Sequence, residues 1–103
     1  MSIDSTKDFV GIGTNAPNAK LSVKNSQLGS VAFQITAAEG QTADLLEIRD
    51  ASEKSIFAID SSGHIGIGTS SSKENALAVS GTSTFSGLVN FNSDVHFGSA
   101  KIG

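Results

Sequence analysis

The chain has 103 residues, a net charge of −3 and no cysteine, so it offers room for one conventional domain at most. The acidic balance gives no support to nucleic-acid binding, no apolar run reaches membrane-spanning length, and neither disulfides nor thiolate metal sites can stabilise the fold. Hydrophobic residues make up 38% of the chain, with six Phe and neither Trp nor Tyr. Because a lone chain of this kind has few large side chains to bury, we expect it to find burial against copies of itself.

An internal repeat begins near the N-terminus. Residues 10–14 read Val-Gly-Ile-Gly-Thr, and residues 65–69 read Ile-Gly-Ile-Gly-Thr. After a polar loop, Leu-Ser-Val at 21–23 returns as Leu-Ala-Val at 77–79, with one more residue in the second loop. Each copy therefore predicts two short strands and a connecting loop, and Pro17, the single proline, suits a bend between such strands.

The paired glycines of this motif require a geometric explanation. Alternation places Ile12 on one side of its strand, and Gly11 and Gly13 on the other. Glycine weakens a strand unless another backbone approaches closely or φ must be positive. In a trimer, Ile12 and Ile67 would each form a three-fold cluster on the axis, and the glycines would let neighbouring chains pass close by.

A phosphate-binding glycine loop is the competing interpretation of the same motif. Neither copy completes Gly-x-Gly-x-x-Gly, since Ala16 and Ser71 occupy the last position. No helical pattern follows either copy, and no lysine stands where a phosphate loop needs one. The motif therefore does not predict nucleotide binding.

Alternation with a period of two dominates the middle of the chain. Val31, Phe33 and Ile35 predict one face of a strand. Residues 43–69 predict a meander of three short strands, with a hairpin loop at 50–54 and a turn at 61–63. The alternative is a short helix through residues 44–47, capped by Thr42, because Leu and Glu are good helix formers.

Charged residues of the meander have structural explanations. Asp50 and Asp60 close strands before Ser- or Ala-containing turns, so Asx-type hydrogen bonding accounts for them without catalysis. Glu47 and Arg49 share a strand face and could pair across a chain interface, which would contribute about 0–1 kcal/mol.

The two histidines are expected to face solvent. His64 alternates with Ile65 and Ile67, and His96 opposes its apolar neighbours in the same way. Three copies of one histidine can bind a metal on a trimer axis, but neither belongs to a His-x-His pair. We therefore assign no catalytic, cofactor-binding or metal-binding residue.

The C-terminal part changes to a period of six. Val89-x-Phe91 is followed by Val95-x-Phe97, Phe85 comes six residues before Phe91, and Ile102 extends the apolar pattern. A strand, a sharp turn and one inward apolar pair per six residues would produce this spacing. Because so few turns cannot bury a solenoid of one chain, three chains winding around one axis are expected. The candidates for the trimer core are Ile12, Ile67, Phe85, Val89, Phe91, Val95 and Phe97.

Several stretches resemble repeats of phage tail-fibre and related viral fibre proteins. Residues 40–50 and 55–69 run from a Leu-Leu-x-Ile strand, through a second strand, into Asp-x-x-Gly-x-Ile-Gly-Ile-Gly-Thr. Residues 82–91 are similar to the Phe-Ser-Gly-x-Val-x-Phe shaft segments of these proteins. The likeness covers most of residues 9–97, but no proline follows the second Gly-Ile-Gly-Thr, and residues 51–53 lack the glycine common in that hairpin.

The resemblance implies a homotrimeric, intertwined β-fibre that joins a virion to a host-binding tip. Its partners would be other fibre or baseplate proteins and a host surface receptor, without nucleic acid or membrane insertion. It would reside in the virion's tail fibre after assembly in the host cytoplasm, which the absence of cysteine fits. A receptor- or glycan-binding module is one alternative, although Trp and Tyr anchors are absent. A trimeric capsid or baseplate decoration protein is another, whereas an enzyme is not expected.

The expected fold class is all-β, an elongated intertwined homotrimer of short strands and β-meanders with a triple β-helix-like C-terminal segment. We expect four segments along the chain. They are an N-terminal segment with the first Gly-Ile-Gly-Thr copy at 1–24, a β-meander at 25–62, the second copy at 63–80 and a β shaft segment of hexad period at 81–103.

Overall fold

Regular structure in this protein is entirely β, which confirms the predicted all-β class. The computed structural model describes residues 1–98 and divides into two compact units, Met1–Leu45 and a second that begins at Leu46. The described residues contain two mixed sheets and no helix. Ile102 and the end of the predicted shaft segment lie outside the described residues.

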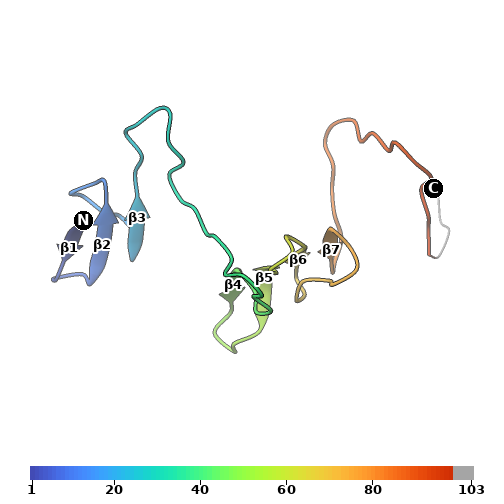
Figure 1. Cartoon of the computed structure of the whole chain (residues 1–103), viewed down its shortest axis with the longest axis horizontal. Helices are drawn as coiled ribbons and strands as arrows, with labels where there is room; N and C mark the ends of the chain where they lie inside the picture. The colour runs from blue at the N-terminus through green and yellow to red at the C-terminus, as the bar shows by residue number, and fades with distance from the viewer. Residues whose placement is uncertain (99–103) are drawn as a thin grey trace. The chain divides into compact units, whose positions relative to one another are not determined.

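The first unit holds a sheet of three strands in the order β1-β2-β3 (Figure 1). β1 (Ser2–Asp4) pairs antiparallel with β2 (Phe9–Ile12), and β2 pairs parallel with β3 (Leu21–Val23). The first Gly-Ile-Gly motif and the Leu-x-Val tripeptide therefore lie side by side, as neighbouring parallel strands.

The second unit holds a sheet of four strands in the order β4-β5-β6-β7. The strands are β4 (Leu46–Arg49), β5 (Ser55–Ile59), β6 (Ile65–Ile67) and β7 (Leu77–Val79). β4, β5 and β6 are successive antiparallel neighbours, which confirms the predicted three-strand meander, and β7 is parallel to β6. Because Leu46–Arg49 is a strand, the alternative helix at 44–47 is wrong.

The sequence repeat is also a repeat of hydrogen bonds. Val10 N–H donates to Lys20 O at 2.8 Å, and its counterpart Ile65 N–H donates to Ala76 O at 2.9 Å. The other ends of the two parallel pairs match as well, through Lys24 N to Ile12 O and Ser80 N to Ile67 O, both at 2.9 Å. Parallel neighbours usually need a long crossover. Strands of three or four residues reach only about 10 Å, so loops as short as those at 13–20 and 68–76 return to the starting edge.

Each connecting loop folds back onto the glycine in the middle of the preceding strand. A Cβ on Gly66 would stand 2.6 Å from Ser70 O and 2.7 Å from Thr69 O, and a Cβ on Gly11 would stand 2.5 Å from Thr14 O. The following glycines turn the chain into the loop, with φ of 79° at Gly13 and 73° at Gly68. The predicted close approach is therefore real, but the chain's own loop makes it, and the expectation that the glycines leave space for neighbouring chains is wrong.

Two long stretches of the described chain, residues 24–45 and 80–98, have no strand. β3 ends at Val23 and β4 begins at Leu46, so the strand predicted from Val31, Phe33 and Ile35 is wrong for the single chain. Apolar alternation marks a backbone that can pair, but a strand also needs a neighbour to supply its ladder. Residues 80–98 carry no strand either, and the triple β-helix-like arrangement there stays a prediction.

The β4–β5 hairpin closes through the turn predicted at 50–54. Asp50 accepts through Oδ1 from the N–H groups of Ser52 at 2.9 Å and Lys54 at 3.0 Å. Glu53 completes the turn with φ of 65°, a left-handed conformation that costs a residue with a Cβ about 1–2 kcal/mol. Glycine would adopt this conformation without that cost.

We expect Gly66→Ala to destabilise the protein by about 1–3 kcal/mol, because the added methyl group overlaps the backbone of the covering loop. Thermal unfolding followed by circular dichroism measures the effect. Gly98→Ala is the matched control, since no atom lies within 4 Å of a Cβ there, and it should change stability by less than about 0.5 kcal/mol. Equal melting temperatures for the two variants would contradict the close approach.

Glu53→Gly should stabilise the protein by up to about 1 kcal/mol, because relief of the left-handed strain exceeds the entropy that glycine loses on folding. The variant also gives up the exposed Glu53–Arg49 ion pair at 3.4 Å, which contributes little. Denaturant titration measures the gain. Ser52→Gly, next to it, is the control and should lower stability, so a gain from both variants would argue against the turn geometry.

Candidate functional site: the open apolar sheet faces

One side of the first sheet is covered with large apolar side chains. Pairing across the strands puts Val10 beside Leu21 and Ile12 beside Val23, and directly paired residues project from the same side. Ile3 joins them through its pairing with Val10. Within this single chain Ile12 is 46% exposed and Leu21 53% exposed. We call this set the first apolar face.

The second sheet has a larger surface of the same kind. The pairings of its four strands align two rows of apolar residues across the sheet. We call these rows the second apolar face: Leu46, Ile59, Ile65 and Leu77 in one row, and Ile48, Phe57, Ile67 and Val79 in the other. Ile48, Ile67, Leu77 and Val79 are 48%, 41%, 56% and 42% exposed, whereas the other four members are partly buried, so half of the face is open in the single chain.

Small residues occupy the opposite side of the second sheet, under the chain's own loop. Ala58 pairs with Gly66, and Gly66 pairs with Ala78. Ala58 is 1% exposed and is the buried hydrophobic residue of the described chain. The loop that leaves β6 covers Gly66 through the carbonyls of Thr69 and Ser70. The second sheet thus buries the small side chain of Ala58 and leaves Ile48, Ile67, Leu77 and Val79 exposed, the reverse of a domain that closes its own core.

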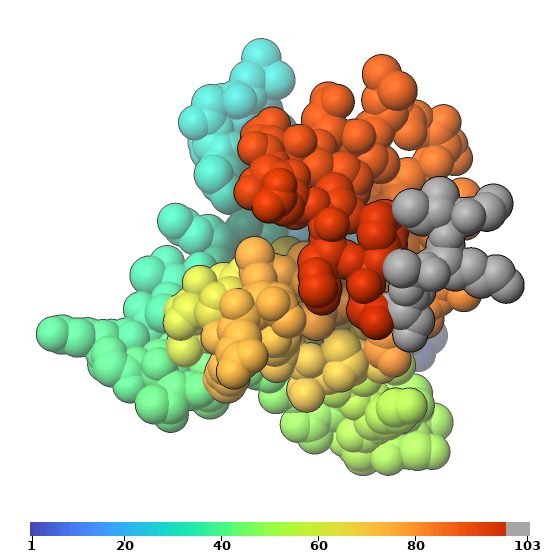
Figure 2. Space-filling model, turned by 90° about the vertical axis from the view of Figure 1, so that its right-hand side faces the viewer, coloured from blue at the N-terminus to red at the C-terminus, as the bar shows by residue number. Residues whose placement is uncertain are grey.

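The seven trimer-core candidates are all exposed in the single chain. Ile12 belongs to the first apolar face and Ile67 to the second. The other five lie in the strandless stretch after β7, seen at the orange-to-red end of the colour range in Figure 2. Their exposed fractions run from 43% to 71%, for Phe85, Val89, Phe91, Val95 and Phe97. Sequence reasoning missed most members of the two faces, although the Leu-x-Val tripeptides in both copies carried the signal.

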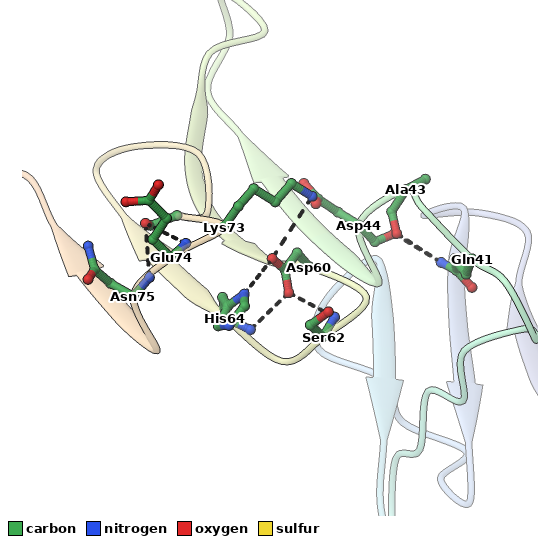
Figure 3. A network of polar contacts seen from close by, with 10 residues as sticks. Gln41, Ala43, Asp44, Asp60, Ser62, His64, Lys73, Glu74 and Asn75 are labelled. Carbon is green, nitrogen blue, oxygen red and sulfur yellow. Dashed lines mark hydrogen bonds and ion pairs between the residues drawn. The ribbon is translucent and has the colours of Figure 1, made fainter.

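A polar cluster lies at the turn between β5 and β6 (Figure 3). The Asp60 side chain is 1% exposed, and its Oδ1 accepts from the N–H groups of Ser62 and His64, both at 2.9 Å. His64 Nδ1 stands 2.9 Å from Asp60 Oδ2. Because an ionised carboxylate can only accept, Nδ1 carries the proton. Lys73 Nζ approaches the same oxygen at 4.0 Å.

Two opposing effects act on the pKa of the Asp60 carboxyl, and the lowering effect is the stronger one. Burial by itself raises its pKa, but the backbone N–H and the ring of His64, together with the backbone N–H of Ser62, lower the pKa from 3.8 to about 2. These donors provide hydrogen bonds to the ionised carboxylate in place of the water that burial excludes. The predicted Asx turn at Asp60 is therefore confirmed, with a histidine partner in addition.

His64 corrects one sequence expectation. Its side chain is 28% exposed and bonded to a buried carboxylate, so it is not a free solvent-facing residue, whereas His96 is exposed as expected. Asp–His pairs activate nucleophiles only when a serine, cysteine or water stands at the second ring nitrogen. Here the pair braces a turn.

The ion pair expected between chains forms within this one. Arg49 Nε donates to Glu47 Oε2 at 2.7 Å. The hydrogen bond and charge of Glu47, with a weaker contribution from Glu53, raise the pKa of the Arg49 guanidinium. The three residues form a short charged ladder at the start of the β4–β5 hairpin, and Glu47 is engaged without a second chain.

The described residues of the first unit line a shallow polar groove. This open groove of about 560 Å³ runs along β3 and is lined by residues such as Thr14, Asn18, Ser22 and Lys24. In residues 1–98, no three His, Cys, Asp or Glu side chains gather as they would around a metal ion. The described part of the chain also has no helix long and apolar enough to span a membrane.

Comparison with known proteins adds no family. No protein-family model matches the chain, and no curated protein matches its sequence.

We expect the Asp60 cluster to give the protein an acid-sensitive stability. The folded-state pKa of Asp60 lies below its ordinary value, so its stabilising contribution is present above about pH 3.8 and is lost as the pH falls toward 2. Melting temperatures measured from pH 5 to pH 2 should fall for the natural chain, and less steeply for Asp60→Asn.

Asp50→Asn is the matched control, since it alters the same kind of turn in the neighbouring hairpin and retains Asp60. Its acid dependence should follow that of the natural chain. If Asp60→Asn and Asp50→Asn flatten the profile equally, the effect does not belong to the Asp60–His64 pair.

Proposed function

We propose that this chain is a structural segment of a trimeric viral fibre, of the phage tail-fibre kind, and that three copies close its apolar faces. The observation that carries the proposal is the inverted placement of side chains in the sheets. Small residues lie under the covering loop, and rows of Ile, Leu, Val and Phe stand open on the other side. Exposed patches of this kind mark surfaces for association.

Energetics support association as the role of these faces. Full burial of an Ile, Leu, Val or Phe side chain contributes about 1.5–3 kcal/mol. The half-exposed residues of the second apolar face therefore leave several kcal/mol per chain unrealised in the single chain. A one-chain domain of this size has little reserve to lose, so the open faces are better explained as the interior of an assembly.

Three copies suit the pattern better than a single different partner. Both apolar faces follow the same Gly-Ile-Gly and Leu-x-Val arrangement, and an interface built from copies repeats the same surfaces by symmetry. The hexad spacing of Phe85, Phe91 and Phe97 adds a third apolar feature, which the resemblance to fibre shafts connects with threefold winding.

The proposal gives the protein a mechanical role. It would connect other fibre or baseplate proteins of a virion to a host-recognition tip, after assembly in the host cytoplasm, and the host receptor would be bound elsewhere. Its chemistry would consist of association and backbone pairing, with no reaction and no cofactor. Native mass spectrometry should give three times the chain mass, and a monomer would overturn the proposal.

Ile67→Asp tests the proposed interface. Ile67 is 41% exposed, so a single chain would tolerate the change, at a cost near the 0.2–1 kcal/mol of a cross-strand pair. In a trimer that packs this face, three carboxylates would enter an apolar layer without partners. We therefore expect loss of the trimer, measured by light scattering and native mass.

Asn75→Asp provides the control, because it adds the same charge at an exposed position of the loop before β7. It should leave the mass unchanged. Trimers of unchanged melting temperature from both variants would show that the second apolar face is not the interface.

A further inference from the structure

Each sheet is followed along the chain by a segment with the same motif. After β3 ends at Val23, residues 29–33 read Gly-Ser-Val-Ala-Phe. After β7 ends at Val79, residues 87–91 read Gly-Leu-Val-Asn-Phe. The internal repeat therefore continues beyond the sheets into a shared Gly-x-Val-x-Phe motif.

Both motifs stand open in the described structure. All residues of 24–40 and 79–98 are exposed. Val31 and Phe33 are 75% and 61% exposed, and their counterparts Val89 and Phe91 are 43% and 65% exposed. The two segments share sequence, exposure and the lack of a strand, so one explanation should serve both.

Local polar contacts shape the first segment and leave its apolar residues unused. Before the motif, Asn25 Nδ2 donates to Ser30 O at 2.7 Å. After it, Ala38 N–H donates to Gln41 Oε1 at 2.9 Å. Two hydrogen-bonded turns thus bracket the stretch, in which Val31, Phe33 and Ile35 alternate with small or polar residues. In an extended conformation this alternation would place the three apolar side chains along one edge.

The absence of charged side chains in both segments favours one kind of partner for this apolar edge. Residues 25–38 contain no charged side chain, and neither do residues 80–93. Recognition of a different protein commonly uses complementary charges. Copies of one chain around an axis place identical residues together, where like charges would repel. Two uncharged segments, each with an apolar edge, therefore fit association with their own copies.

We infer that residues 29–35 form a second shaft segment, in which Val31, Phe33 and Ile35 of three copies pack against one another, as Val89 and Phe91 do in the C-terminal segment. This inference rests on the proposed trimer and assigns a self-association site to a part of the chain that has no strand of its own. Sheets and shaft segments then alternate twice along the sequence.

Cysteine cross-linking tests the inference in the full chain, which has no natural cysteine. Phe33→Cys places one thiol per copy on the apolar edge, and Gln34→Cys places it on the adjacent outward position. Disulfides form readily when Cα atoms come within about 4.4–6.8 Å. After mild oxidation, a denaturing gel should show a linked dimer for Phe33→Cys and none for Gln34→Cys.

Native mass of the same variants separates the possible failures. If the protein is a trimer but neither Phe33→Cys nor Val31→Cys gives a linked dimer, this inference is overturned. The same holds if Gln34→Cys cross-links as well as Phe33→Cys does. In both cases the proposed trimer itself is unaffected. A natural chain that is monomeric overturns both. Dissociation caused by Phe33→Cys but not by Gln34→Cys supports the inference, because only contact at Phe33 explains the difference.

Discussion

The close approach of a loop to a strand glycine determines how the rest of this protein is arranged. At Gly66, and again at Gly11, carbonyl oxygens of the following loop occupy the space that a Cβ would need. In the second sheet, small residues flank the glycine directly, since Ala58 and Ala78 both pair with Gly66. Because strand residues alternate between two sides, the isoleucines that flank these glycines, Ile12, Ile65 and Ile67, project from the other side, where they remain partly exposed in the single chain.

Turns are held by side-chain hydrogen bonds in place of a core. Asp4, Asp50 and Asp60 each accept from two backbone N–H groups of the turn that follows. Such contacts fix local geometry but contribute only about 0.5–1.5 kcal/mol each. They define the shape of each sheet, and under the proposed assembly the larger free energy of apolar burial would come from association. This division explains how a chain with one buried hydrophobic residue among those described, Ala58, still has defined strands.

Much of the fold was predictable because it depends on local signals. The meander at 43–69 follows from alternation and turn residues, and the repeated motif identified strands in both units. Parallel pairing of β6 with β7 was not predictable, since alternation carries no direction and a nine-residue return is possible only because the strands are so short. The strand expected at 31–35 failed for a related reason, because the sequence records the readiness of a segment to pair but not the chain that supplies its neighbour.

Some residues of the candidate site were also predictable from the sequence, and others were not. Ile12 and Ile67 were identifiable from the repeat, yet the rows to which they belong depend on register, which only the folded sheets define. His64 was misread because its strand neighbours predict its side but not the Asp60 carboxylate that reaches it from the turn. The missing information was thus the pairing register for the two isoleucines, and the local side-chain geometry of the turn for His64.

In the proposed trimer, assembly and folding would be coupled. Where large side chains are buried only between copies, the folded state is stabilised by mass action, and its stability depends on the concentration of chains. Uncharged apolar edges would also expose the unassembled chain to wrong association. Short strands, frequent aspartate turns and a left-handed residue such as Glu53 limit how far a misaligned neighbour could extend a sheet. In the proposed trimer, the same features that deprive the chain of its own core would favour partners that repeat its register, as its own copies do.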